Sequence, residues 1–171
     1  MGLPIDRFIA ATNLNNTVPR YLQTGRYEPM TSIKTLSNAM DVGKPSNFER
    51  IIALFPEFEG LRDLISGHET TDTQTLACIK KVYKEHRYLL DPHGAVAYDA
   101  LDNFLSKNDG YAGVLLETAH PCKFLDVMYQ VVDRDSVPIP NKVRKLMDRN
   151  KVATPITADY SSFYSYLMDQ R

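Results

Sequence analysis

The sequence predicts an α/β fold that is rich in helices and has a few mostly parallel strands. Three observations predict it: short apolar runs end in polar residues, helix-start signals follow those runs, and no repeat or long linker interrupts the alternation. A chain of 171 residues is long enough for one hydrophobic core. We therefore expect residues 1–171 to form a single domain or a fragment of one.

Two apolar runs predict strands. Residues 8–11 lead directly into a cluster of asparagine and threonine at 13–17, which is typical of a strand that ends in a polar loop. Residues 111–116 are continuously apolar apart from one glycine, and this pattern indicates a strand buried on both faces of a parallel sheet. Both segments are expected to belong to the sheet.

Capping signals predict two helices in the first half of the chain. Ser46 with Glu49, and Thr71 with Gln74, each fit the capping box, in which the side chains at the two ends of the box bond to each other's backbone N–H groups. The first of these helices is expected to run to about Leu54. The second is followed by apolar residues at helical spacing.

Four further helices are expected after residue 90. Asp91 followed by Pro92 is a typical helix start, because proline has no N–H to leave unpaired at the first position. Pro121 is expected to open a helix that runs to about residue 132. The patterns at 140–149 and 159–170 predict the last two helices.

Composition excludes several classes of function. With 20 Lys+Arg against 21 Asp+Glu and no basic cluster, the chain is not expected to bind nucleic acid. Its apolar runs are far shorter than the about 20 residues that a membrane span needs. Cys78 and Cys122 are far apart and the histidines are scattered, so we expect no metal site and reduced thiols in a cytoplasmic protein.

Two loops are favoured as ligand sites, because ligands of α/β sheets bind beyond the carboxyl ends of strands. They are residues 12–17 and 117–123. In the second loop, His120 and Cys122 allow either a nucleophilic pair or a capping histidine beside a packed thiol. Residues 35–45 are either a plain loop or the lining of a site, and turn chemistry alone accounts for an asparagine cluster.

Four blocks of the sequence resemble threonine synthase. They are residues 7–20, residues 36–47, residues 91–98 and residues 117–124, and they occur in the order and spacing of that family. The resemblance is to the bacterial and fungal type and to its C-terminal portion only. It implies the C-terminal part of a tryptophan-synthase-like, fold type II enzyme that depends on pyridoxal 5′-phosphate.

The resemblance also implies an activity and a set of site residues. Such enzymes convert O-phospho-L-homoserine and water into L-threonine and phosphate. Thr118 matches the position whose hydroxyl faces the cofactor's pyridine nitrogen, and the turn that contains His93 is expected to border the cofactor. The residues expected to contact the substrate are Asn13, Asn15, Thr17, Ser37, Asn38, Asp41, His120 and Lys123.

Two features of the family have no counterpart here. No segment resembles the one that carries the Schiff-base lysine, and none resembles the glycine-rich loop that holds the cofactor phosphate. We expect both to lie in a missing N-terminal portion, which would be the partner of this chain. The chain alone is then expected to contain no catalytic residue and to be inactive. The alternative is a non-catalytic amino-acid-binding or interaction module derived from the enzyme.

Overall fold

The computed structural model describes residues 4–169. The chain divides into two compact units with the boundary between Pro138 and Ile139. The described elements are β1 (Phe8–Thr12), α1 (Thr17–Thr24), the 3₁₀ turn η1 (Asn38–Met40), α2 (Phe48–Leu54), α3 (Phe58–Leu64), β2 (Ile65–Glu69), α4 (Asp72–His86), α5 (Pro92–Leu105), η2 (Pro121–Lys123), α6 (Leu125–Met128), η3 (Arg134–Ser136), α7 (Asn141–Met147) and α8 (Tyr160–Asp169).

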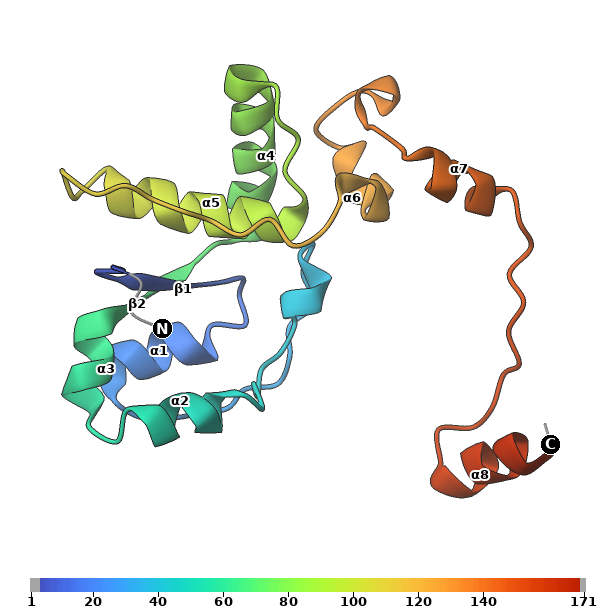
Figure 1. Ribbon diagram of the computed structural model, residues 1–171, viewed down its shortest axis with the longest axis horizontal. Helices are drawn as coiled ribbons and strands as arrows, with labels where there is room; N and C mark the ends of the chain where they lie inside the picture. The colour runs from blue at the N-terminus through green and yellow to red at the C-terminus, as the bar shows by residue number, and fades with distance from the viewer. Residues whose placement is uncertain (1–3, 170–171) are drawn as a thin grey trace. The chain divides into compact units, whose positions relative to one another are not determined.

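The sheet consists of two parallel strands, so the predicted class, helix-rich with few parallel strands, is confirmed. β1, predicted from residues 8–11, pairs with β2 in a register that sets Phe8 opposite Ile65. Figure 1 shows α5 on one side of this pair and α1 on the other. A Cβ on Gly67 would lie 2.6 Å from Cα of Pro19, so α1 can approach β2 only because residue 67 is glycine.

The two helices with the strongest start signals form as predicted. Thr71 accepts a hydrogen bond from the backbone N–H of Gln74 (3.3 Å), and the Gln74 side chain accepts one from the backbone N–H of Thr71 (2.8 Å). Asp91 precedes α5, and its side chain accepts a hydrogen bond from the backbone N–H of His93 (2.9 Å). These caps fix the ends of α4 and α5 that point toward the candidate site.

The main hydrophobic core lies between α4, the start of α5 and α6. Its buried members come from all three helices and from the loops beside them: Cys78, Ile79, Val82, Leu89, Leu90, Ala95, Val127, Met128 and Val137. A smaller aromatic cluster joins α1 to α2, where the Phe48 ring meets the edge of Tyr21 at 4.8 Å and stacks on Tyr27 at 4.5 Å. No helix within residues 4–169 is both long and apolar enough to cross a membrane.

The prediction of a buried strand at 111–116 is wrong. The segment runs along α5, with Gly113 against Leu101, and it pairs with no strand in the described part of the chain (Figure 1). Val114 and Leu116 are 86% and 76% exposed. A continuous apolar pattern predicts a strand that is covered on both faces, whereas this segment packs against α5 on one side only.

Two other helix predictions need correction. The capping box at Ser46 does not form, because α2 begins two residues later at Phe48 and no side chain caps it. The helix expected from Pro121 to about residue 132 is instead the turn η2 followed by the short helix α6. Phe124 separates the two with non-helical backbone angles, and its ring packs against His93 at 5.0 Å. The contact of Phe124 with His93 thus interrupts the helix that the apolar spacing after Pro121 predicts.

The second compact unit contains α7 and α8, which lie in the two predicted ranges. The expected last residue of the final helix, Gln170, lies outside the described residues. The large apolar side chains of α8 are exposed: Tyr160, Phe163, Tyr164 and Leu167.

We expect the core between α4, α5 and α6 to dominate the stability of the first unit. Met128 is completely buried there, so Met128→Ala should lower the free energy of unfolding by about 2–5 kcal/mol. The matched control is Met147→Ala on α7, where the side chain is 55% exposed and the change should be within about 0.5 kcal/mol. Urea unfolding followed by circular dichroism measures both, and equal effects would contradict the assigned core.

Candidate functional site

The site residues expected from sequence fall into two groups. The first group follows β1 and includes the loop at η1, and most of its members are buried. Asn13, Asn15, Ser37 and Asp41 join with Thr35 in what we call the polar network. The second group lines a cavity at the start of η2, and it contains Thr118, His120 and Lys123.

Asn13 is the centre of the polar network. It is 1% exposed, and its amide nitrogen lies within hydrogen-bonding distance of Asp41 Oδ1 (2.9 Å), Thr35 Oγ1 (2.7 Å) and Ser37 Oγ (3.1 Å). Its amide oxygen accepts hydrogen bonds from both the backbone and the side chain of Asn15, each at 2.9 Å. Because the whole amide is satisfied within the protein, Asn13 shapes the loop around it.

The other members of the first group are used in different ways. Asn15 pairs with the backbone of Ile33, accepting from its N–H and donating to its carbonyl, both at 2.8 Å. Thr17 donates to the carbonyl of Gly43 (2.8 Å) and lies outside the polar network. Asn38 is exposed, and within residues 4–169 its side chain makes no hydrogen bond. Asn38 is therefore the member of this group that is open to a ligand.

The second group surrounds a cavity of about 710 Å³, a volume in the range of small-molecule sites. Thr118 is exposed, and its hydroxyl makes no hydrogen bond within the described part of the chain. Glu117, from the favoured loop, also lines the cavity, and so do three residues that the sequence analysis missed: Tyr83, Arg87 and Tyr88. Arg87 ends α4 in the left-handed conformation (φ 55°), which only the folded structure reveals.

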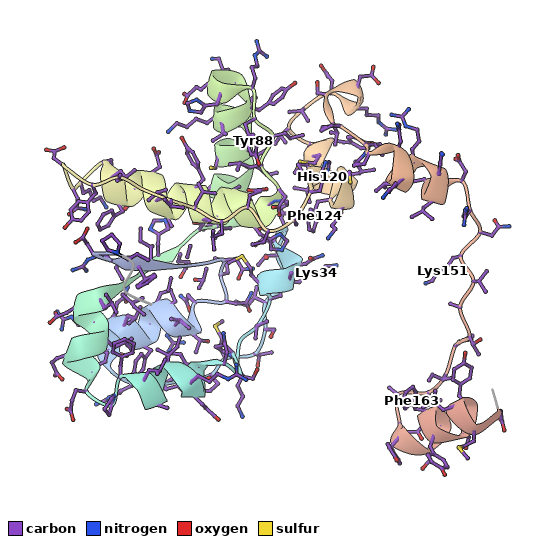
Figure 2. The ribbon with its side chains drawn as sticks, viewed as in Figure 1. Lys34, Tyr88, His120, Phe124, Lys151 and Phe163 are labelled. Atoms are coloured by element: carbon purple, nitrogen blue, oxygen red, sulfur yellow. The ribbon has the colours of Figure 1, made fainter. Side chains whose placement is uncertain are left out.

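His120 acts as a cap. Its Nδ1 accepts a hydrogen bond from the backbone N–H of Cys122 (3.2 Å), so this nitrogen faces the backbone of Cys122 and not its thiol. Of the two alternatives left open by the sequence, this geometry favours the cap. Figure 2 shows Tyr88, His120 and Phe124 where the segment that follows α5 reaches α6.

The thiol of Cys78 is unsuited to act as a nucleophile, because burial raises its pKa to about 12.

His93 connects the two groups. Its Nε2 accepts a hydrogen bond from the backbone N–H of Ala39 in η1 (3.1 Å), which fixes the ring proton on Nδ1. Nδ1–H then donates to the Asp91 carboxylate at 2.6 Å. Both ring nitrogens are thus occupied, and any contact between His93 and a ligand is left to the ring face or to the backbone.

Known proteins that are similar to this chain include threonine synthases. Residues 94–166 match the family model described as threonine synthase, C-terminal. The chain is 38% identical over 169 residues to threonine synthase of Haemophilus influenzae and 37% identical over 172 residues to that of Escherichia coli. The chain matches the C-terminal portion of the threonine synthase family.

Solved structures of threonine synthases share the fold of this chain. The crystal structure of threonine synthase from Escherichia coli superposes with a TM-score of 0.82 over 99% of this chain, at 36% identity. Threonine synthase of Brucella melitensis, solved with pyridoxal phosphate bound, gives 0.81 at 28% identity and also covers 99% of the chain. The fold is that of the C-terminal part of a fold type II threonine synthase.

The comparisons also define the extent of the match. The matches to the Haemophilus influenzae and Escherichia coli relatives include 98% and 100% of this chain. They include only 39% of each relative. In the same way, this chain covers 39% of the chain in the Escherichia coli crystal structure and 41% of the chain in the Brucella melitensis structure. The chain therefore spans about two fifths of the length of the relatives that it matches.

The geometry separates the structural asparagine from the exposed one. We expect Asn13→Ala to lower the free energy of unfolding by about 1–3 kcal/mol, because it removes the centre of the polar network and leaves the buried backbone N–H of Asn15 without its acceptor. Asn38→Ala is the matched control, and it should change stability by less than about 0.5 kcal/mol. Chemical denaturation of the two variants tests this. A stability loss at Asn38 as large as that at Asn13 would contradict the assignment.

Proposed function

We propose that this chain forms part of the active site of a threonine synthase, a pyridoxal-phosphate-dependent lyase. Such an enzyme converts O-phospho-L-homoserine and water into L-threonine and phosphate. One observation carries the proposal: the Thr118 hydroxyl opens, without a partner in the described part of the chain, into a cavity that Arg87 and Lys123 also line. A free hydroxyl beside two cations suits a ligand with a ring nitrogen and anionic groups.

The residues of the cavity fit the cofactor. Pyridoxal phosphate supplies an electron sink for substrate carbanions. In the proposed site the Thr118 hydroxyl would hold the pyridine nitrogen, and the turn at His93 would border the cofactor through its backbone. A hydroxyl is neutral, so unlike a carboxylate it does not hold that nitrogen protonated. Thr118 thus orients the ring and leaves it a moderate electron sink.

Charge is the proposed means of substrate binding. O-phospho-L-homoserine carries a phosphate and a carboxylate, and the cavity is lined by Lys123 and Arg87 together with His120. Cations in a partly closed cavity attract such anions strongly, because the local dielectric is below that of water. Asn38 extends the site from η1. The polar network holds this loop in one shape and does not itself need to touch the substrate.

We propose that the Schiff-base lysine and the phosphate-binding loop come from another portion of the enzyme. The segment 111–116 supports this partner, because it is extended and apolar, and Val114 and Leu116 are exposed. A second strand beside it would satisfy its backbone groups and cover both side chains. The unpaired segment is continuous with Thr118, so a strand added there would also complete the cofactor site.

A reducing compartment such as the cytoplasm is the proposed location. Both cysteines are free thiols in the structure, Cys78 buried and Cys122 half-buried. Free thiols that form no disulfide are typical of proteins from reducing compartments.

The activity is tested by co-expressing this chain with the preceding portion of Escherichia coli threonine synthase. We expect release of phosphate and L-threonine from O-phospho-L-homoserine only when both parts are present. Thr118→Val should lower kcat/KM by about tenfold or more, because it removes a hydrogen bond to the cofactor. Thr118→Ser keeps the hydroxyl and should retain most of the activity.

The matched control is Thr154→Val, at an exposed position in the second unit, which should leave the activity unchanged. An assembled protein that binds pyridoxal phosphate but does not act on O-phospho-L-homoserine would overturn the proposal. It would favour the non-catalytic binding module.

The absence of a Schiff-base lysine is tested on the chain alone. The chain is incubated with pyridoxal phosphate, reduced with borohydride, and digested for mass spectrometry. We expect no single lysine to be labelled stoichiometrically, because Lys123 lines the cavity only as a surface cation. Selective labelling of one lysine, together with turnover, would show that this chain is a complete enzyme.

A further inference from the structure

Two carboxyl groups meet at the N-terminus of α5. Asp91 is 0% exposed, and one of its oxygens, Oδ1, accepts the hydrogen bonds from the backbone and the ring of His93. Glu117, which comes from the far end of the apolar segment, reaches the same place. Its Oε1 accepts a hydrogen bond from the backbone N–H of Asp91 (3.0 Å). Glu117 is therefore bound to residue 91 by at least one of its two oxygens.

The second oxygen of each carboxyl group is the informative one. Asp91 Oδ2 and Glu117 Oε2 are both buried, and neither has an ordinary donor as a partner within the described residues. Both carboxyl groups lie at the first turn of α5, and each one shifts the pKa of the other. A carboxyl–carboxyl hydrogen bond requires a proton on one of the two groups. One proton shared between Asp91 Oδ2 and Glu117 Oε2 would give each of these oxygens a hydrogen-bond partner.

Gly94 provides the space for this contact. A Cβ at residue 94 would lie 1.7 Å from Glu117 Oε2 and 2.5 Å from its Cδ. No other residue at this position would leave the Glu117 carboxyl where it is, because every other side chain begins with a Cβ. The first turn of α5 is thus shaped to receive the head of Glu117.

The surroundings decide which group keeps the proton. Burial favours the neutral form of both, but two donors from His93 favour the ionised form of Asp91, and its pKa lies below the ordinary value. Burial and then the neighbouring Asp91 raise the pKa of Glu117 to about 8. Near neutral pH, Glu117 is therefore the acid and Asp91 the anion, because two carboxylates in contact do not both ionise.

We propose that Glu117 is a positioning residue, held as a carboxylic acid that donates its proton to Asp91 and thereby fixes Thr118 to the first turn of α5. The hydrogen bonds form a ring, since the acid accepts from the Asp91 backbone and donates to the Asp91 side chain. Thr118 follows Glu117 directly in the chain, so the orientation of its backbone depends on this ring. The inference goes beyond the proposed function, because it concerns a set of hydrogen bonds within this chain. It can be tested without any enzymatic activity.

The other titratable groups near the pair lie on two sides. On α5 the neighbour is His93, whose ring proton is committed to Asp91. On the cavity side, the titratable residues that share the lining with Glu117 are Tyr83, Arg87, Tyr88, His120 and Lys123. No direct hydrogen bond or ion pair joins any of these five to Glu117 among the described residues. Burial is thus the first cause of the raised pKa of Glu117, and Asp91 is the titratable neighbour that adds to it.

The direction of the pH dependence follows from the raised pKa. The folded chain binds the Glu117 proton more tightly than the unfolded chain, in which the ordinary value of 4.5 applies. The stabilisation from this proton is complete below pH 4.5 and is lost as the pH rises toward about 8. Above that pH two adjacent carboxylates repel each other, and the hydrogen bonds that hold Glu117 and Thr118 at the first turn of α5 weaken.

The test is a carbon-detected NMR titration of the full chain with labelled glutamate side chains. We expect the carboxyl carbon of Glu117 to titrate with a midpoint near 8. In Asp91→Asn the midpoint should fall by about one pH unit or more, because the neighbouring charge is gone and asparagine still caps the helix. A midpoint at the ordinary value in the unmodified chain would overturn the proposal.

A second measurement tests the positioning role. Glu117→Gln keeps a donor and an acceptor in place but does not titrate, so its melting temperature should match the unmodified chain at pH 6 and exceed it at pH 9 by several degrees. Amide exchange at residues 117–119, corrected for intrinsic rates, should accelerate about tenfold by pH 9 in the unmodified chain only. Glu59→Gln, at an exposed position on α3, is the matched control and should change neither. Equal pH dependence in Glu117→Gln would overturn the proposal.

Discussion

The first turn of α5 is the constraint on which both halves of the candidate site depend. Asp91 is fully buried there, and a buried carboxylate is stable only if hydrogen bonds replace the water it has lost. Those bonds come from the backbone and the ring of His93, which is bound in turn to Ala39. Glu117 accepts a hydrogen bond from the backbone N–H of Asp91 and so lies at the same turn. One charge therefore connects the loop at η1, the helix α5 and the segment before Thr118. Displacing any one of them leaves the charge without part of its compensation.

The two groups of site residues differ in how much hydrogen-bonding capacity remains free. In the polar network every donor of Asn13 and every donor of Asn15 is already engaged within the protein. Around the cavity, the Thr118 hydroxyl has no partner among the described residues, and the ammonium group of Lys123 is in no ion pair there. A site needs both kinds of residue, because free groups bind a ligand well only if satisfied ones hold them in place. The polar network is the framework, and the cavity is the proposed place of contact.

Local signals in the sequence were sufficient where the interactions are local. Thr71 with Gln74, and Asp91 with Pro92, set their helix ends through contacts within four residues, and both ends form as predicted. β2 was not predicted, because Ile65–Glu69 contains a glycine and three polar residues and becomes a strand only beside β1. Ser46 carries the same signal as Thr71, but the chain around Phe48 is fixed by its contact with Tyr21 and Tyr27.

The candidate site was predictable in its parts but not in its connections. The loops at 12–17 and 117–123 follow from the rule that ligands bind beyond strand ends, even though the second strand is not paired here. What the sequence does not show is that Asn13 meets Asp41, or that Gly94 makes room for Glu117. Those contacts join residues more than twenty positions apart. No short motif contains both partners of either contact, so only the folded chain brings them together.

The exposed segment 111–116 and the buried pair at Glu117 are two ends of one stretch of chain, and this links assembly to chemistry. Glu117 is fixed by the first turn of α5, while Val114 and Leu116 extend into solvent. On the proposed function, a strand from the rest of the enzyme pairs with the exposed end. That strand then meets a segment whose register is already set, because the last residue before Thr118 cannot slide without breaking its bonds to Asp91. Pairing therefore places the incoming portion relative to Thr118, and the cofactor site acquires its geometry as the sheet is completed.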